Sequence, residues 1–378
     1  MEIYLDNGAT TRVCPEAAEI ALKVMCEDYG NPSSTHKKGR EAKAVLDHAR
    51  AQIMAALGAK DGELVFTSCG SESDNWAVME GAAAKKRVGK HIISSVTEHD
   101  AIRKSLEAME QRGWEVTLLS PGADGAVSPE AVREALRPDT ALVSLMLVNN
   151  ETGAITDIAG VRKVLKEAGS QALLHTDAVQ GFLKVTFTPA SLGADLISLS
   201  GHKIHAPKGI GALYIAKGVR IAPYILGGGQ ENGLRSGTEP LPQIAAFGAA
   251  AEAGAKEAAE AQRRMAELRQ RCIDRVKAEA EDAVVIGGGA PHVLCLSLPG
   301  YRSEVLMNWL EAKEIYVSKG SACKRGRRSH VLEAMNLPAK VIDGAIRVSL
   351  SRFTTAEEID AFAEALLEAR RSLRPSLR

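Results

Sequence analysis

Residues 172–203 read ALLHTDAVQGFLKVTFTPASLGADLISLSGHK, and this stretch decides the fold. It holds two short apolar runs, 172–176 and 195–198, each the length of a buried strand. Other runs of this kind, with helical patterns from about residues 72 and 101 among them, lie at 63–67, 91–96, 115–119 and 141–148. Short, nearly all-apolar strands that alternate with helices predict a mostly parallel sheet covered on both faces.

Asp177 directly follows the first run. Lys203, 26 positions after Asp177, follows the second run. Ligands of such sheets bind at the carboxyl ends of the strands, so these two side chains could lie side by side. A pyridoxal cofactor requires this pair, because the lysine forms a Schiff base and the carboxylate keeps the pyridine nitrogen protonated. Taken singly, a surface lysine and a helix-capping aspartate are the more common situation.

Two glycine-containing segments suggest further contacts with a ligand. Residues 67–72 (TSCGSE) form a strand, a turn of small residues and a helix start, where free N–H groups suit a phosphate. An ordinary capping box at Ser71 is the alternative reading of this segment. Residues 227–238 (GGGQENGLRSGT) favour a close-fitting loop, since their polar side chains differ from those of a flexible Gly/Ser linker.

Cys323 stands out among the six cysteines, at 14, 26, 69, 272, 295 and 323. Their spacing fits neither a metal site nor a disulfide framework, so we expect no metal and reduced thiols. Cys323 lies in GSACKRGRR (320–328), where four cationic residues should favour the nucleophilic thiolate. Cys295, within an apolar run, is typical of an inert core thiol.

The composition is that of an ordinary globular protein. Lys+Arg and Asp+Glu both count 47 among 378 residues, a balance that argues against a general nucleic-acid binder. No apolar run approaches the roughly 18 residues of a membrane span, and residues 1–6 do not resemble a signal peptide. We therefore expect a cytoplasmic protein that contacts neither membrane nor nucleic acid.

The chain is long enough for a large domain and a smaller companion. Residues 249–271, rich in Ala, Glu and Arg, predict a long amphipathic helix that bridges two domains. Apolar runs at 293–298 and 345–350 read as strands of the smaller unit. We expect a large domain over 15–250 and a small domain from 1–14 and 251–378, which carries the cysteine segment.

Six ordered motifs resemble those of the cysteine desulfurases of the iron–sulfur-assembly and nitrogen-fixation type, within the class-V aminotransferase family. The resemblance extends from YLDNGATT (4–11) to RVSLSRFT (347–354), nearly the whole chain. It implies a pyridoxal-phosphate (PLP) enzyme of the aspartate-aminotransferase type (fold type I), an α/β protein with active sites at the interface of a homodimer. The motifs are GNPSS (30–34), TEH (97–99), VNNETG (148–153), SGHK (200–203), RSGT (235–238) and GSAC (320–323).

The resemblance also implies roles for individual residues. Lys203 carries the cofactor and moves protons, Asp177 pairs with the pyridine nitrogen, and Cys323 accepts the sulfur of L-cysteine as a persulfide. His99 stacks on the ring and acts in acid–base steps, and Arg347 binds the substrate carboxylate, assisted by Asn31. The remaining cofactor contacts are Asn150 and Gln180 near the phenolic oxygen, and Gly70, Ser71, Ser200, His202 and, from the other subunit, Thr238 at the phosphate.

The expected reaction yields L-alanine and passes sulfur to an acceptor protein, for iron–sulfur cluster assembly or for thiolation of tRNA or a cofactor. Two features depart from the family pattern: Cys69 in the phosphate turn, and the short basic stretch after Cys323. We expect that stretch to favour an acidic acceptor surface. The alternative activity is that of a selenocysteine lyase or another fold-type-I lyase. A catalytically idle assembly partner and a nucleic-acid binder fit the residues less well.

Overall fold

The computed structural model describes residues 2–319 and 328–375. Its largest element is a seven-stranded sheet with the strand order β2-β8-β7-β6-β5-β3-β4. Five neighbouring strands run parallel, while β8 pairs antiparallel with both β2 and β7. The strands are β2 (Glu63–Thr67), β3 (His91–Ser95), β4 (Glu115–Leu119), β5 (Thr140–Ser144), β6 (Leu173–Asp177), β7 (Leu196–Ser200) and β8 (Gly211–Ile215).

Both faces of this sheet are buried, which explains the nearly all-apolar strands. Along β6, Leu173 packs into the cluster under α3 and α4, and Leu174 packs into the cluster on the opposite face with α2, α6 and α8. Successive strand residues point to opposite faces, so each must be apolar where both faces are covered. The helices are α1 (Pro15–Cys26), α2 (Lys37–Leu57), α3 (Gly70–Ala84), α4 (Asp100–Gln111), α5 (Pro129–Ala135), α6 (Ile158–Glu167) and α7 (Pro189–Leu192).

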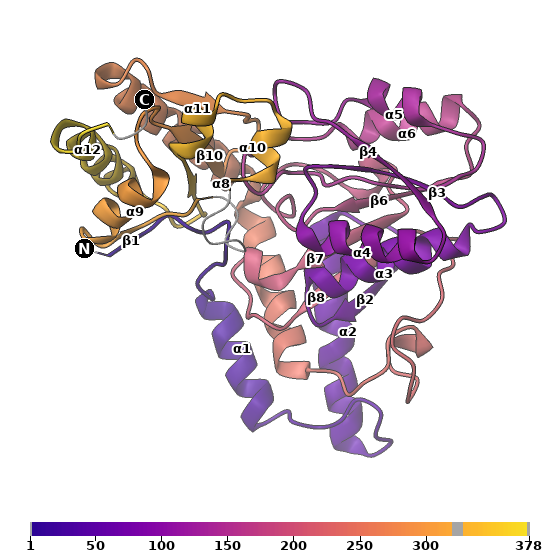
Figure 1. Cartoon of the computed structure of the whole chain (residues 1–378). Helices are drawn as coiled ribbons and strands as arrows, with labels where there is room; N and C mark the ends of the chain where they lie inside the picture. The colour runs from indigo at the N-terminus through magenta and orange to yellow at the C-terminus, as the bar shows by residue number, and fades with distance from the viewer. Residues whose placement is uncertain (1, 320–327, 376–378) are drawn as a thin grey trace.

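A smaller α+β unit lies beside the sheet and holds both ends of the chain (Figure 1). Its strands form a three-stranded antiparallel sheet, β12-β10-β9, and a two-stranded parallel pair, β1-β11. These strands are β1 (Ile3–Tyr4), β9 (Val284–Ile286), β10 (Val293–Ser297), β11 (Ile315–Tyr316) and β12 (Ala345–Ser349). The helices are α9 (Ser303–Glu311), α10 (His330–Ala334), α11 (Ala339–Asp343) and α12 (Ala356–Ser372).

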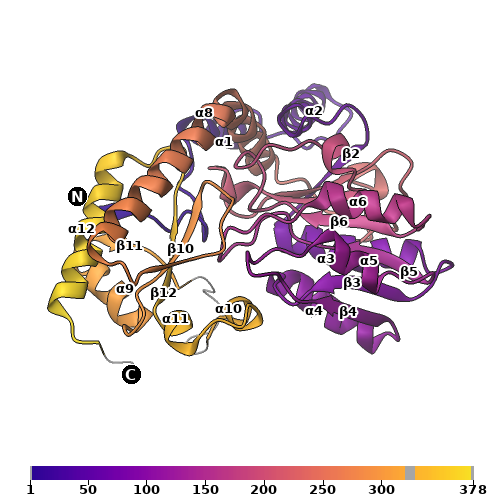
Figure 2. The ribbon, with the colours of Figure 1, turned by 90° about the horizontal axis from the view of Figure 1, so that it is seen from above.

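Helix α8 (Leu241–Glu279) joins the two units (Figure 2). Its first half buries residues such as Phe247 in the core of the large sheet, and its second half buries residues such as Leu268 in the core of the small unit. The sequence therefore predicted the bridging helix, though not its full length. The two separate cores support the domain division that we propose, 15–250 against 1–14 and 251–378.

The other differences from the sequence prediction are local. Strand β8 was not predicted, although its run GALYI is apolar. The predicted strand at 141–148 was too long, because β5 ends at Ser144. The chain continues as a loop whose backbone N–H groups at Leu145 and Leu147 donate to carbonyls of β6. No helix of the described residues is both long and apolar enough to cross a membrane.

The contact between α2 and α8 depends on Gly248. A Cβ there would lie 2.7 Å from Ala49 Cα and 2.9 Å from Ala49 Cβ. We expect Gly248→Ala to lower the free energy of unfolding by about 1–3 kcal/mol, because the two helices would have to separate. The measurement is the urea midpoint of unfolding.

Gly254→Ala on the same helix is the matched control. Its Cβ would meet the flexible end of Leu183, with Cδ1 at 2.8 Å, which can rotate away. Alanine also favours the helix by about 1 kcal/mol over glycine, so this variant should be close to neutral. Equal midpoints for the two variants would contradict the close-packing argument.

Candidate active site

A cavity of about 630 Å³ lies where the carboxyl ends of β6 and β7 face the small unit. Its size is within the usual range for small-molecule and cofactor sites. The cavity brings together most of the side chains that the sequence predicted. These are Gly70, Ser71, His99, Asn150, Asp177, Gln180, Ser200, His202, Lys203 and Arg347.

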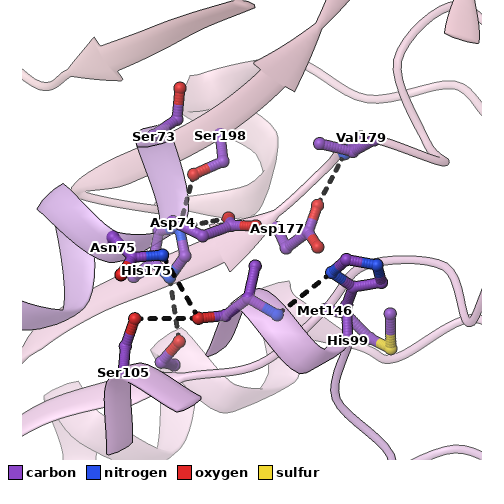
Figure 3. Close-up of polar contacts among 12 residues, drawn as sticks. Ser73, Asp74, Asn75, His99, Ser105, Met146, His175, Asp177, Val179 and Ser198 are labelled. Carbon is purple, nitrogen blue, oxygen red and sulfur yellow. Dashed lines mark hydrogen bonds and ion pairs between the residues drawn. The ribbon is translucent and has the colours of Figure 1, made fainter. Parts of the chain in front are cut away.

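Asp177 and Lys203 lie at the carboxyl ends of two neighbouring parallel strands, β6 and β7, as the sequence predicted. Asp177 is the last residue of β6, and Lys203 closes the short 3-10 helix η1 (Gly201–Lys203) that follows β7. Asp177 is only 5% exposed, its Oδ1 accepts from Val179 N at 2.8 Å, and burial raises the pKa of its carboxyl (Figure 3). Lys203 Nζ donates to Gly8 O at 2.6 Å. The pair therefore offers a buried acid and an amine in one cavity.

One end of the cavity is suited to an anion. Gly70 and Ser71 form the first turn of α3, where N–H groups have no acceptor within the helix. A Cβ at Gly70 would lie 2.8 Å from Val179 Cγ2, so this position needs glycine. In the described part of the chain, Ser200 Oγ is buried without a hydrogen-bond partner. The alternative capping box did not form, because the N-cap residue is Cys69 and its side chain makes no cap bond.

His99 caps the start of α4 and lines the cavity. Its Nδ1 accepts from Ala101 N at 3.2 Å, so a neutral ring carries its proton on Nε2. Figure 3 shows the ring near Asp177. The helix cap therefore fixes the tautomer of an imidazole that can donate from Nε2.

Three buried polar residues behind Asp177 were not identified from the sequence. His175 is fully buried, with Nδ1 2.8 Å from Ser144 Oγ and Nε2 3.0 Å from Ser198 Oγ. Burial lowers the pKa of His175 to about 3 and raises the pKa values of Asp74 and Glu98 well above their usual range. Glu98 precedes His99 in the TEH motif (97–99), and this position was the feature of the sequence that could have identified it as a site residue.

The N-terminal arm also belongs to the site, which the sequence reasoning missed. Gly8 O accepts from Gln180 Nε2 at 2.8 Å, as well as from Lys203, and Ala9 O accepts from Lys203 Nζ at 2.8 Å. His202 Nδ1 lies 3.1 Å from Thr10 Oγ1. The motif at 4–11 marked this segment as part of the resemblance but assigned it no role.

Arg347, in β12 of the small unit, reaches the cavity from the other side. It is only 3% exposed, and its guanidinium donates to Asn150 O at 2.9 Å and to Asp6 Oδ1 at 2.7 Å. Asn31 and Thr238 do not line this cavity; both are exposed on the chain. Cys323 lies outside the described residues.

The fold and this cavity define an enzyme of the pyridoxal-phosphate class, fold type I. A model of the family described as aminotransferase class-V matches residues 3–362. Cysteine desulfurase IscS of Methanosarcina thermophila is 41% identical over 379 residues, which cover 98% of this chain and 93% of that protein. The chain belongs to the class-V aminotransferase family and, within it, to the cysteine desulfurases.

Solved structures agree with this assignment. A structure titled NifS-like protein superposes with a TM-score of 0.92 at 36% identity, covering 99% of this chain and 100% of that one. A second, titled SspA in complex with cysteine, has a TM-score of 0.80 at 32% identity and covers 93% of this chain and 100% of that one. Enzymes of this family depend on pyridoxal phosphate.

The residues present fit this cofactor. The buried hydroxyl of Ser200 and the first turn of α3 offer unused hydrogen bonds at one end, as a phosphate requires. The buried carboxyl of Asp177 lies at the floor, and the amine of Lys203 lines the same cavity. In the described residues, Gln180 Oε1 is a further buried atom without a partner.

The buried imidazole of His175 predicts a pH dependence of stability. Its pKa is lower in the folded protein than the usual 6.5, so below that pH the unfolded chain takes up more protons. The contribution to stability is therefore lost as the pH falls from 6.5 toward 3. As the pH falls, we expect the free energy of unfolding of His175→Asn to decrease less steeply than that of wild type. The difference between the two slopes should be up to about 1.4 kcal/mol per pH unit.

Unfolding midpoints of wild type and His175→Asn between pH 6.5 and 5 measure this difference. His48→Asn, which removes an exposed ring, is the matched control. Parallel curves for wild type and His175→Asn would rule out the contribution.

Proposed function

We propose that this enzyme removes the sulfur of L-cysteine, giving L-alanine and a persulfide on Cys323. The observation that carries the proposal is the convergence of Lys203, Asp177 and Arg347 on one cavity in a chain of this family. These three side chains provide an amine, a buried acid and a carboxylate receptor, which together accommodate an amino acid beside the cofactor.

The cofactor would be held at both ends. Gly70, Ser71, Ser200 and His202 would hold the phosphate, and Thr238 would reach it from the partner subunit. Asp177 would pair with the pyridine nitrogen, and Asn150 and Gln180 would bind near the phenolic oxygen. When bound, pyridoxal phosphate supplies an electron sink that eases loss of the Cα proton and weakens the C–S bond.

The protein's own groups would orient the substrate and move its protons. Arg347 would bind the substrate carboxylate, since a guanidinium matches a carboxylate with two parallel hydrogen bonds. The amine of Lys203, freed from the cofactor, would take the Cα proton. His99, whose proton lies on Nε2, would stack on the ring and donate in a later acid–base step.

The sulfur transfer balances without an oxidant. The thiolate of Cys323 attacks the substrate sulfur, an S–S bond forms, and the C–S bond breaks. The electron pair of the broken bond stays with carbon, which takes up a proton and becomes the methyl group of L-alanine. Cys323 then holds the sulfur as a persulfide until a second thiol, on an acceptor protein or a small molecule, removes it.

Arg328, the described residue that ends the stretch 320–328, already forms an ion pair. Its guanidinium donates to both carboxylate oxygens of Asp343 at 2.7 Å, and the next residue, Ser329, donates to Glu151. Of the basic residues considered for an acidic acceptor, Arg325 and Arg327 are therefore the better candidates. The acceptor would serve iron–sulfur cluster assembly or thiolation of tRNA or a cofactor.

We further propose a homodimer in the cytoplasm. Leu22, Met25, Tyr29 and Leu226 are large apolar side chains exposed on the single chain, as expected of a surface that a second copy covers. Asn31 follows Tyr29 closely in sequence, and Thr238 is the last residue of the glycine-rich loop 227–238. A partner could therefore supply these two residues to a cavity that neither reaches within its own chain.

The test of the proposed function is release of L-alanine and sulfide from L-cysteine in the presence of a reductant. We expect Cys323→Ser to lose the sulfide signal while the absorbance of the bound cofactor remains, because serine cannot accept the sulfur. Cys26→Ser, at an exposed position in α1, is the matched control and should behave as wild type. Sulfide release by Cys323→Ser at the wild-type rate would refute the assignment.

Charge reversal tests the acceptor surface. We expect Arg325→Glu combined with Arg327→Glu to slow sulfur transfer to an acidic acceptor protein by about tenfold at low salt, since such steering is electrostatic. Transfer to dithiothreitol, which is uncharged, should be unaffected. Equal slowing with both acceptors would indicate damage to Cys323 itself.

A further inference from the structure

The orientation of Arg347 depends on the N-terminal arm. Besides Asn150 O, its guanidinium binds Asp6 Oδ1 at 2.7 Å, with 3% of Arg347 and 20% of the Asp6 side chain exposed. A Cβ on Gly8 would lie 3.2 Å from Arg347 Cζ, so the arm packs directly against the guanidinium. Such a buried cation needs a nearby negative charge, and Asp6 supplies it.

The arm that carries Asp6 is itself held in place. Asn7 N donates to Ser349 O at 3.2 Å, and Gly8 N donates to Ser349 Oγ at 2.7 Å. Ser349 lies on β12 two residues after Arg347. Asp6 is therefore fixed relative to the strand that bears Arg347, and a fixed carboxylate can hold a guanidinium in one orientation.

Asp6 and Arg347 line different cavities. Asp6 lines a second cavity of about 470 Å³, together with Glu2, Tyr4 and Glu311, and it does not line the first. Arg347 lines the first cavity and not the second. Asp6 thus binds the guanidinium from outside the cavity that holds Lys203, and Arg347 itself lines that cavity.

We propose that Asp6 is a positioning residue that orients Arg347 to receive the substrate carboxylate, and so sets the affinity for the amino acid. This inference rests on the proposed role of Arg347. A competing arrangement has Asp6 occupying the place of the substrate carboxylate, from which the substrate must displace it. The two arrangements predict opposite changes in affinity when Asp6 is removed.

Binding of L-alanine to the holoenzyme, followed by cofactor absorbance, measures this affinity without turnover. We expect Asp6→Ala to raise the Kd for L-alanine about tenfold, the size of one charge-assisted hydrogen bond. Ethylamine, which is L-alanine without the carboxylate, should bind both proteins equally. Tighter binding of L-alanine by Asp6→Ala would overturn the proposal in favour of competition.

With L-cysteine, the same variant should raise KM about tenfold and change kcat less than about twofold, as expected when uniform binding is lost. Asp6→Asn keeps an acceptor of the same shape without the charge, and it should fall between wild type and Asp6→Ala. It also replaces Asp6→Ala if that variant fails to fold. Glu311→Gln removes an acid from the same second cavity and, as the matched control, should match wild type.

A double-mutant cycle decides whether Asp6 acts through Arg347. In an Arg347→Ala background, Asp6→Ala should leave the Kd for L-alanine unchanged. The same tenfold increase in that background would overturn the proposal. If L-cysteine releases no sulfide but Asp6→Ala still raises the Kd for L-alanine, the proposed function fails and the role of Asp6 stands. If sulfide is released but Asp6→Ala leaves that Kd unchanged, the role of Asp6 fails and the proposed function stands.

Discussion

The burial of Asp177 is the constraint on which the rest of the site depends. A carboxyl out of contact with water is costly unless hydrogen bonds or opposite charges stabilise its ionised form. The hydrogen bond comes from Val179 N, in the turn that follows β6. The loops at the carboxyl edge of the sheet bring His99 and Lys203 close enough to lower the pKa of Asp177 against the effect of burial. The sheet is therefore both the scaffold and part of the electrostatic environment.

The N-terminal arm connects parts of the site that are far apart in sequence. It lies on β12, more than 300 residues away, and its carbonyls at Gly8 and Ala9 accept from Lys203 of the large unit. Asp6 on the same arm holds Arg347. A shift of the arm would thus displace Lys203 and Arg347 together, which couples the two units.

The sequence predicted the parts of this structure that have a repeating physical signal. Apolar runs predicted the buried parallel strands, and the motifs predicted that Lys203 and Asp177 lie together at the ends of two of them. Strand β8 was missed because one apolar run near glycines does not reveal an antiparallel partner. Asp74 was missed because an acidic residue early in a helix reads as an ordinary charge-dipole contact, and only the folded chain shows that it is buried.

Buried acids in this chain need not carry the same charge, and their partners explain why. Glu231 receives two hydrogen bonds from Arg50 and one from Phe66 N, so a guanidinium and a backbone N–H both face its carboxylate. Glu98 receives one hydrogen bond, from Met146 N, and burial keeps its pKa well above the usual range. Burial raises the pKa values of all three carboxyls at the cavity floor, and for Asp177 the neighbouring His99 and Lys203 oppose that rise. The carboxyl whose surroundings most favour ionisation is therefore the one expected to meet the pyridine nitrogen.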